Sequence, residues 1–285
     1  QQLKSRIRSV KSTKQITKAM QMVAASKMRR AQEATKSSQA YTVAARELLT
    51  YLAAQGATNG HKWFTVRPVK SRLLIVVASD KGLAGAYNAN ILKSYVHELK
   101  SDDAANIANK TIAVGRKIAQ AATRIKDTEI VGTYEDLPDH FSGAEFHAIL
   151  NTAKDMFEAN QVDAVDVIFT RFVSSLTQRA DVVRLFPAGF TPTDNVQPDI
   201  AEARFEPSPK QIIDDIAYRL ISARLFQALM DSRASEHSMR MLAMKNATDN
   251  ATDLVDALTL EMNKARQAAI TQELTEISAG VEAMR

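Results

Sequence analysis

Cysteine is absent from this chain of 285 residues, and every chemistry that depends on a thiol is absent with it. Disulfide scaffolds, thiolate zinc sites, thiol nucleophiles and thiol redox switches are therefore excluded. Aromatic residues are also scarce, at 6% of the chain with one Trp. The longest obvious apolar run, residues 73–78, is far shorter than the ~20 residues that cross a bilayer, so we expect no membrane-spanning segment.

Glycine and proline are missing from two long stretches, residues 1–55 and residues 210–279. Both stretches are rich in Ala, Met, Leu, Lys, Gln and Arg, so each predicts one long helix. At ~1.5 Å per residue these helices would reach roughly 80 Å and 105 Å, which is longer than a compact core. Pro207 and Pro209 suit the start of the second helix, and Gly280 suits its end.

Acidic residues are nearly missing from the first 36 positions, which hold ten basic residues and a single acid, Glu33. This local charge of +9 leaves −4 for the rest of the chain, so the N-terminal segment predicts an acidic partner. Nucleic acid, anionic lipid and an acidic protein surface all fit the charge, and a transit peptide fits the composition. Within this segment we define a basic patch that consists of Lys11, Lys14, Lys27, Arg29 and Arg30.

Apolar side chains repeat at alternating three- and four-residue steps along the second long helix, from residue 241 to residue 269, with Thr248 as the polar exception. This spacing is typical of a coiled-coil seam. Because the intervening segment joins one end of each long helix, we expect the two helices to pair antiparallel. The matching stripe that we expect in the first helix begins with Leu3, Ile7 and Val10 and continues on a slightly rotated line with Ile16, Met20 and Val23.

The middle of the chain alternates short β-branched runs with helical patterns. Residues 73–79 have the continuous apolar character of a strand that is buried on both faces. Further expected strands are 111–114, 129–133, 165–173 and 181–186, and the expected helices are 86–99, 116–125 and 144–159. The pattern predicts a doubly wound, Rossmann-like α/β domain. The chain is thus expected to be an α/β protein with helical segments 1–58 and 209–285 around a domain at 70–205, joined through polar connections at 56–62 and 191–209.

A turn of sequence SDKGLAGAYN follows the first expected strand, and it contains Ser79, Asp80, Lys81, Gly82 and Gly85. It lacks both the Gly-x-x-x-x-Gly-Lys-Ser/Thr loop and the Gly-x-Gly-x-x-Gly fingerprint that hold phosphates. A tight turn between strand and helix is the favoured interpretation, while docking of a partner at the carboxyl ends of the strands stays open. The five His show no His-Glu-x-x-His spacing, and no Gly-x-Ser-x-Gly elbow occurs. The sequence predicts no catalytic, metal or cofactor site.

Three blocks of the chain resemble the gamma subunits of the F-type ATP synthases, in the order expected for that family. They are IRSVKSTKQITKAMQMVAASKMRRAQ at residues 7–32, the turn SDKGLAGAYN, and the stretch from residue 235 to residue 284. The form GLAGAYN looks bacterial. The resemblance implies a left-handed antiparallel coiled coil that stands inside a hexamer of alternating alpha and beta subunits. It also implies a rotor: proton flow turns a ring of c subunits together with the shaft, which drives the beta subunits in sequence.

The resemblance further implies partners and contact residues. The blocks at residues 16–20 and 265–271 would face beta loops, with Arg266 and Gln267 hydrogen-bonded to one loop and Lys18 beside an acidic segment; Met20 belongs to the first block. For Arg266 a solvated helix flank stays open as the alternative. Mg-ATP and ADP would be bound by alpha and beta, with no cofactor in this chain. The epsilon subunit and the c ring would lie near the central domain, at the cytoplasmic face of a bacterial plasma membrane or the matrix side of a mitochondrial inner membrane.

Two other classes of protein compete with this interpretation. A coiled-coil nucleic-acid-binding protein would use the +9 segment on phosphates, with an affinity that falls steeply with salt. However, the first 36 residues contain no aromatic side chain on which a base could stack. A dinucleotide-binding enzyme is the third possibility, and the missing glycine fingerprint weakens it.

Overall fold

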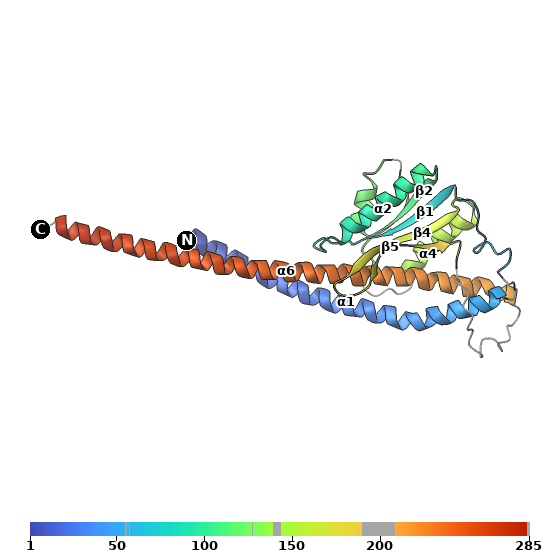
Figure 1. The fold of residues 1–285 in the computed structure, drawn as a ribbon, viewed down its shortest axis with the longest axis horizontal. Helices are drawn as coiled ribbons and strands as arrows, with labels where there is room; N and C mark the ends of the chain where they lie inside the picture. Colours follow the sequence, from blue (N-terminus) through green and yellow to red (C-terminus); the bar gives the residue numbers. More distant parts are fainter. Residues whose placement is uncertain (55, 57, 127, 139–143, 190–208, 284–285) are drawn as a thin grey trace. The chain divides into compact units, whose positions relative to one another are not determined.

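The computed structural model describes the chain apart from residues 55, 57, 127, 139–143, 190–208 and 284–285 (Figure 1). It contains two compact units: the first combines Gln1–Ala24 with Arg240–Arg285, and the second is Ala25–Met239. In chain order, the helices and strands are α1 (Gln2–Ala54), β1 (Ser71–Val77), α2 (Tyr87–Ala104), β2 (Ala108–Val114), α3 (Arg116–Ala122), β3 (Glu129–Tyr134), α4 (Ala144–Glu158), β4 (Ala164–Phe172), β5 (Gln178–Phe186) and α6 (Pro209–Ala283).

The two long helices form where glycine and proline are missing. α1 has 53 residues and α6 has 75, and α6 begins at Pro209 as predicted. The predicted end at Gly280 is wrong, because α6 continues through this residue to Ala283. One glycine inside a helix costs only about 1 kcal/mol relative to alanine, which does not stop a long helix. Within the described part of the chain, no helix combines the length and the apolar character that crossing a membrane would require.

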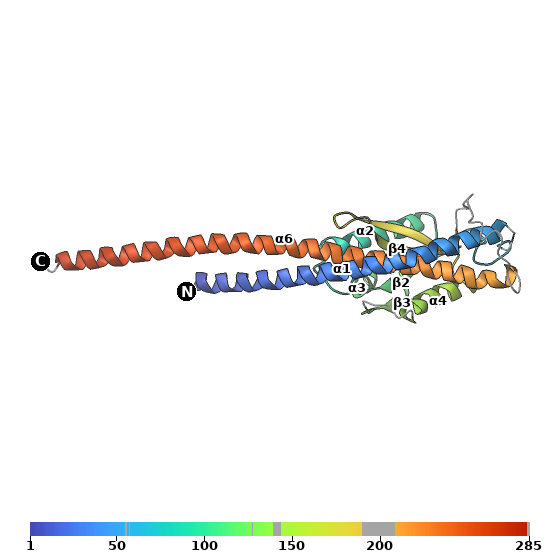
Figure 2. The same cartoon turned by 90° about the horizontal axis from the view of Figure 1, so that it is seen from below.

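In the first unit, the segments of α1 and α6 lie side by side and run antiparallel (Figures 1 and 2). The α6 seam is confirmed over most of its length: Met244, Thr248, Ala251 and Leu258 are buried. The last two predicted seam positions, Ala265 and Ala269, are exposed. A coiled-coil pair is therefore present, and its buried seam in α6 reaches to about residue 262.

The predicted rotation of the α1 stripe is wrong. Ile16 and Val23 are 58% and 56% exposed, whereas Thr17 and Ala24 are buried. The seam instead keeps its regular steps through the half-buried Lys14 and Gln21. Position on the helix decides which side chains of α1 face α6. The apolar stems of Lys and Gln can pack against α6 while their polar ends reach water. The α1 seam consists of Leu3, Ile7, Val10, Lys14, Thr17, Gln21 and Ala24.

The register of the coiled coil follows from one contact in the seam. The hydroxyl oxygens of Thr17 and Thr248 lie 2.8 Å apart. In an antiparallel pair this contact places Ile7 at the level of Leu258 and Ala24 at the level of Met241, so every seam position of α1 meets a seam position of α6. The heptad patterns of the two helices thus agree with the observed contact.

The second unit contains a five-stranded sheet in the order β3-β2-β1-β4-β5. The strands β3, β2, β1 and β4 are parallel, and β5 runs antiparallel to β4. The predicted doubly wound fold is confirmed for the parallel strands. However, the last two strands form a hairpin with no helix between them, because only five residues separate β4 from β5 and a parallel crossover needs a dozen or more.

Helices cover both faces of this sheet, which explains the continuous apolar run of β1. Leu73, Ile75 and Val77 belong to a core that includes residues of α4 and of the first part of α6. Leu74 and Val76 belong to the opposite core, which includes residues of α2 and α3. A third core joins the last turns of α1 to the first turns of α6, through Leu49, Leu52, Ile213 and Leu220 among others.

Candidate partner-contact surfaces

The four residues that the sequence suggests for a beta contact all lie in the first unit, in two separate places. Lys18 is exposed on α1 and Met20 beside it is half-buried. Arg266 and Gln267 are both exposed on α6. From the register set by Thr17 and Thr248, Lys18 lies level with residue 247, so Arg266 is 19 residues further along α6 or about 30 Å away. The structure does not bring the two pairs together.

The α6 segment around Arg266 also exposes large apolar side chains. Ile270, Leu274 and Ile277 are 50%, 60% and 64% exposed, and their spacing of four and three residues puts them on one face of the helix. Exposed apolar stripes of this kind are typical of surfaces that a partner covers. On α1, the exposed Lys11, Lys18 and Met22 likewise share one face.

The basic patch is divided between the two units. Lys11 is exposed and Lys14 half-buried in the first unit; in the second, Lys27 is half-buried and Arg29 and Arg30 are exposed. Lys14 occupies the coiled-coil seam, so its stem packs between the helices rather than facing a partner. The sequence did not indicate this difference, because it depends on the exact register of the seam.

The turn between β1 and α2 is held by hydrogen bonds from its own polar residues. The backbone N–H groups of Arg116 and Asp136 both donate to Asp80 Oδ1, at 3.0 Å and 3.1 Å. The Ser79 hydroxyl donates to Lys81 O at 2.7 Å. Asp80 therefore ties the carboxyl ends of β1, β2 and β3 together at the edge where related folds bind nucleotides.

The backbone conformation of this turn favours glycine at residue 85 but does not require it at residue 82. Gly85 has φ +56° and Leu83 has φ +60°, and the Leu83 side chain is 63% exposed. Gly82 has open space around the position of a Cβ. A tighter requirement lies at the neighbouring Gly115, where φ is +99° and a Cβ would lie 2.2 Å from Ala78 O. The geometry is that of a crossover turn whose polar groups satisfy one another.

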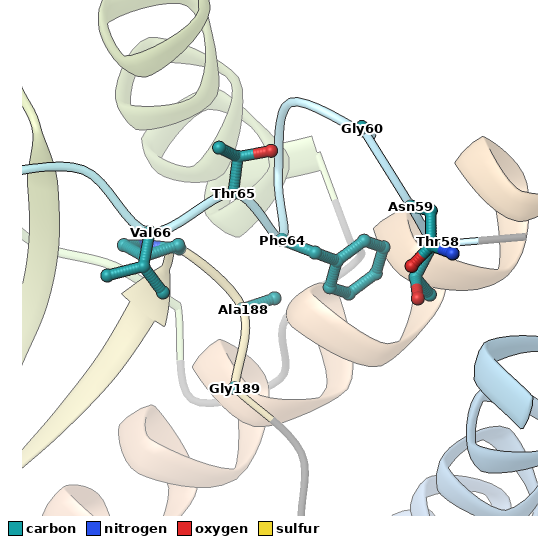
Figure 3. Close-up of a pocket in the computed structure, with 9 residues that line it drawn as sticks. Thr58, Asn59, Gly60, Phe64, Thr65, Val66, Ala188 and Gly189 are labelled. Atoms are coloured by element: carbon teal, nitrogen blue, oxygen red, sulfur yellow. The ribbon is translucent and has the colours of Figure 1, made fainter. Parts of the chain in front are cut away.

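A cavity in the second unit has a volume of about 420 Å³ (Figure 3). Phe64, Val66 and Ala188 supply apolar surface, and the Phe64 ring points toward Thr58 and Asn59. Among the described residues, the lining offers hydroxyl, amide and apolar groups but no titratable side chain. Within the same part of the chain, no three His, Asp or Glu side chains come together as a metal ion would need.

The chain matches known proteins over nearly its whole length. The family described as ATP synthase matches residues 1–284. The chain is 35% identical over 283 residues to an ATP synthase gamma chain of Staphylococcus epidermidis, covering 99% of this chain and 98% of that protein. It is 38% identical over 282 residues to the gamma chain of Desulforamulus reducens, with the same coverage. The chain therefore belongs to the ATP synthase gamma chain family.

Solved structures share the fold. A chain of the central stalk and c ring of the Tetrahymena thermophila mitochondrial ATP synthase matches with a TM-score of 0.59 and 24% identity, over 81% of this chain and 99% of that one. A chain of the Euglena gracilis OSCP/F1/c-ring structure matches with a TM-score of 0.67 and 18% identity, over 99% and 93%. The resemblance drawn from the sequence is confirmed, as is the rotor-shaft function that it implies. The nucleic-acid alternative finds no support.

Proposed function

We propose that this chain transmits torque in an ATP synthase through a steric profile distributed along its coiled coil, and that it has no catalytic site of its own. The observation that carries the proposal is the α6 segment past Ala265, where Arg266 and Gln267 accompany an apolar stripe of Ile270, Leu274 and Ile277 that is half or more exposed. Exposing such a stripe to water costs free energy, and a partner that covers the stripe removes this cost.

In this proposal, alpha and beta subunits surround the first unit. Arg266 and Gln267 contact a beta loop at one level, and Lys18 and Met20 contact beta at a second level about 30 Å lower along the shaft. The exposed cations of the basic patch face acidic partner surfaces. Mg-ATP and ADP are bound by alpha and beta, which is consistent with the missing phosphate loop in this sequence.

The energetics favour a distributed contact over a single bridge. Moving a beta subunit from 1:99 to 99:1 between two conformations takes about 5.5 kcal/mol of differential binding. An exposed ion pair supplies only about 0.2 to 1 kcal/mol. Several levels of the shaft must therefore act together, and the apolar stripe of α6 adds contact area to the polar side chains.

The second unit serves as the base of the rotor in this proposal. Its turn at residues 79–85 holds the strand ends together through Asp80, and the epsilon subunit and the c ring lie near this unit. The complex would be peripheral at the cytoplasmic face of a bacterial plasma membrane, which is supported by the bacterial sources of the relatives named above. The matrix side of a mitochondrial inner membrane is the alternative.

Rotation of a single assembled complex tests the proposal. Ala105 is exposed at the end of α2, and the absence of cysteine lets Ala105→Cys carry one bead attached through a thiol. After assembly with alpha and beta subunits, we expect unidirectional rotation in three main steps per turn under ATP. If ATP is hydrolysed at a normal rate while beads on assembled complexes stay motionless, the chain has a static role and the proposal fails.

A further inference from the structure

A buried polar pair interrupts the coiled-coil seam of the first unit. Thr17 and Thr248 are 8% and 7% exposed, and their hydroxyl oxygens lie 2.8 Å apart. Apolar seam residues occupy nearby levels, with Val10 opposite Val255 and Ala24 opposite Met241. The two adjacent layers pair a half-buried polar side chain of α1 with an apolar one of α6, Lys14 with Ala251 and Gln21 with Met244. Among these described seam layers, the threonine pair is therefore the one in which both helices contribute a polar side chain.

The two hydroxyls also bond their own helices. Thr17 Oγ1 lies 3.0 Å from Lys14 O, and Thr248 Oγ1 lies 2.8 Å from Met244 O. Two hydroxyl protons are shared among three contacts, so one threonine donates to the other while the second donates to its own backbone. Both arrangements satisfy each proton, and both require the two threonines to be opposite each other.

A polar layer at one seam position is the best-known device for setting the register of a coiled coil. An apolar seam with regular steps can slip by one helical turn and still bury apolar surface. A slip of one turn here would separate the two hydroxyls and place Thr17 against Met244 or Ala251, both of which are apolar. We propose that Thr17 and Thr248 are positioning residues that set the axial register of the two shaft helices. The register itself follows from the contact between the two threonines, whereas its effect on the contacts with the beta subunits rests on the proposed function.

The consequence concerns the neighbours of Thr17. Because Thr17 faces the seam, Ile16 and Lys18 on either side of it are exposed. A slip of one turn would move these side chains by about 5.4 Å along the shaft, which is enough to take Lys18 from one partner group to the next. Register therefore decides where the exposed residues of α1 meet the beta subunits.

Engineered disulfides report the register directly, because the chain has no cysteine of its own. The first pair, Ile7→Cys with Leu258→Cys, joins two positions that face each other in the observed register. The second pair, Ile7→Cys with Met262→Cys, joins two positions that face each other only after a slip of one turn. Both pairs are placed in complexes assembled with alpha and beta subunits, with the native threonines or with Thr17→Val and Thr248→Val together. Valine keeps the branched shape and removes the hydroxyl.

We expect the native threonines to give the first disulfide almost alone, and the double valine variant to raise the yield of the second several-fold. Thr17→Ser with Thr248→Ser keeps both hydroxyls and is expected to restore the native ratio. The matched control is Thr13→Val, since Thr13 is exposed and its hydroxyl donates to Ser9 O of its own helix. An unchanged disulfide ratio in the double valine variant overturns the proposal.

A second readout separates this inference from the rotor function. In bead assays on complexes without the added disulfide cysteines, the double valine variant is expected to widen the angular spread of each dwell. Failure of complexes with native threonines to rotate counts against the rotor function, while the disulfide ratio still decides the register. Should the double valine variant not assemble, the single valine variants replace it, and an unchanged disulfide ratio in both overturns the proposal as well.

Discussion

The Arg72 guanidinium and the Asp166 carboxylate form an ion pair inside the second unit, with Arg72 Nε 2.5 Å from Asp166 Oδ2. Arg72 is 8% exposed and Asp166 2%. Arg184 also donates to Asp166, at 2.8 Å, and Asp102 accepts two bonds from Arg72 at 3.1 Å. Burial lowers the pKa of Arg72, but the charges of Asp166 and Asp102 outweigh burial and raise it above its usual value. This network joins β1, β4, β5 and α2.

Removing Asp166 is expected to destabilise the second unit strongly. Asp166→Asn leaves the buried Arg72 without one of its carboxylates, and breaking a buried pair costs about 3 to 5 kcal/mol. We expect the lower end of this range, because Asp102 and Glu98 still contact Arg72. Urea denaturation of the purified chain, followed through the fluorescence of the single Trp63, measures the change.

Arg184 binds the same carboxylate of Asp166, so its removal serves as the comparison for Asp166→Asn. Its side chain is 44% exposed, so Arg184→Ala leaves Asp166 paired with Arg72 and removes only a solvated partner. A loss of about 1 kcal/mol or less is expected. Equal losses for Asp166→Asn and Arg184→Ala would contradict the distinction between a buried and an exposed pair.

Gly115→Ala is expected to destabilise the second unit by about 3 kcal/mol, since positive φ strain and close contact each cost about 1 to 3 kcal/mol. The new Cβ would lie 2.2 Å from Ala78 O, and backbone atoms at a strand end cannot move away cheaply. Gly82→Ala is the control, because a Cβ there meets no atom within 4 Å. Thermal unfolding of the two variants should separate them clearly; similar midpoints would contradict the prediction.

Asp231 makes stability depend on pH. Burial raises the pKa of Asp231 to about 6, against the opposing charge of Arg171, whereas an unfolded Asp titrates near about 3.9. The folded chain therefore binds the proton more tightly, so the contribution of this group is most favourable below about pH 4 and is lost as pH rises through about 6.

At neutral pH the folded chain holds a buried carboxylate at Asp231, which costs free energy, and Asp231→Asn removes this cost. The variant is expected to be more stable than the parent by about 1 to 2 kcal/mol at pH 7.5, with a gain that shrinks as pH falls toward 4. Asp215→Asn, at an exposed position of the same helix, is expected to change stability little at either pH. Denaturation curves at several pH values test this, and a gain for Asp231→Asn that does not vary with pH would count against it.

Arg266→Ala is expected to lower the torque of ATP-driven rotation without stopping it. The side chain is exposed, so the lost contact is worth about 1 kcal/mol against the ~5.5 kcal/mol needed to switch a beta subunit. Deleting the helix past Ala265 also removes the apolar stripe and should lower the torque far more. Lys264→Ala, at an exposed neighbouring position, serves as the control. Complete arrest by Arg266→Ala alone would show that the coupling is not distributed.

Much of this protein could be predicted from the sequence, because the deciding signals are local. The absence of Gly and Pro predicted both long helices, and the β-branched run at residues 73–79 predicted the strand that lies at the centre of the sheet. Regular three- and four-residue steps predicted the α6 seam. The three family blocks predicted the rotor function, which the comparisons confirm, whereas the proposed contacts of Lys18, Met20, Arg266 and Gln267 stay predictions.

Only the tertiary structure decided which side chains share a level or a cavity. Ile16 is more apolar than Thr17, so sequence reasoning placed Ile16 in the seam, yet helix phase turns Thr17 inward and pairs it with Thr248, 231 positions away. Likewise, no local pattern indicates that Asp80 binds the N–H groups of Arg116 and Asp136, or that Arg72 meets Asp166. Periodicity is set by neighbours along the chain, but phase, register and buried charge pairs depend on residues that the fold brings together.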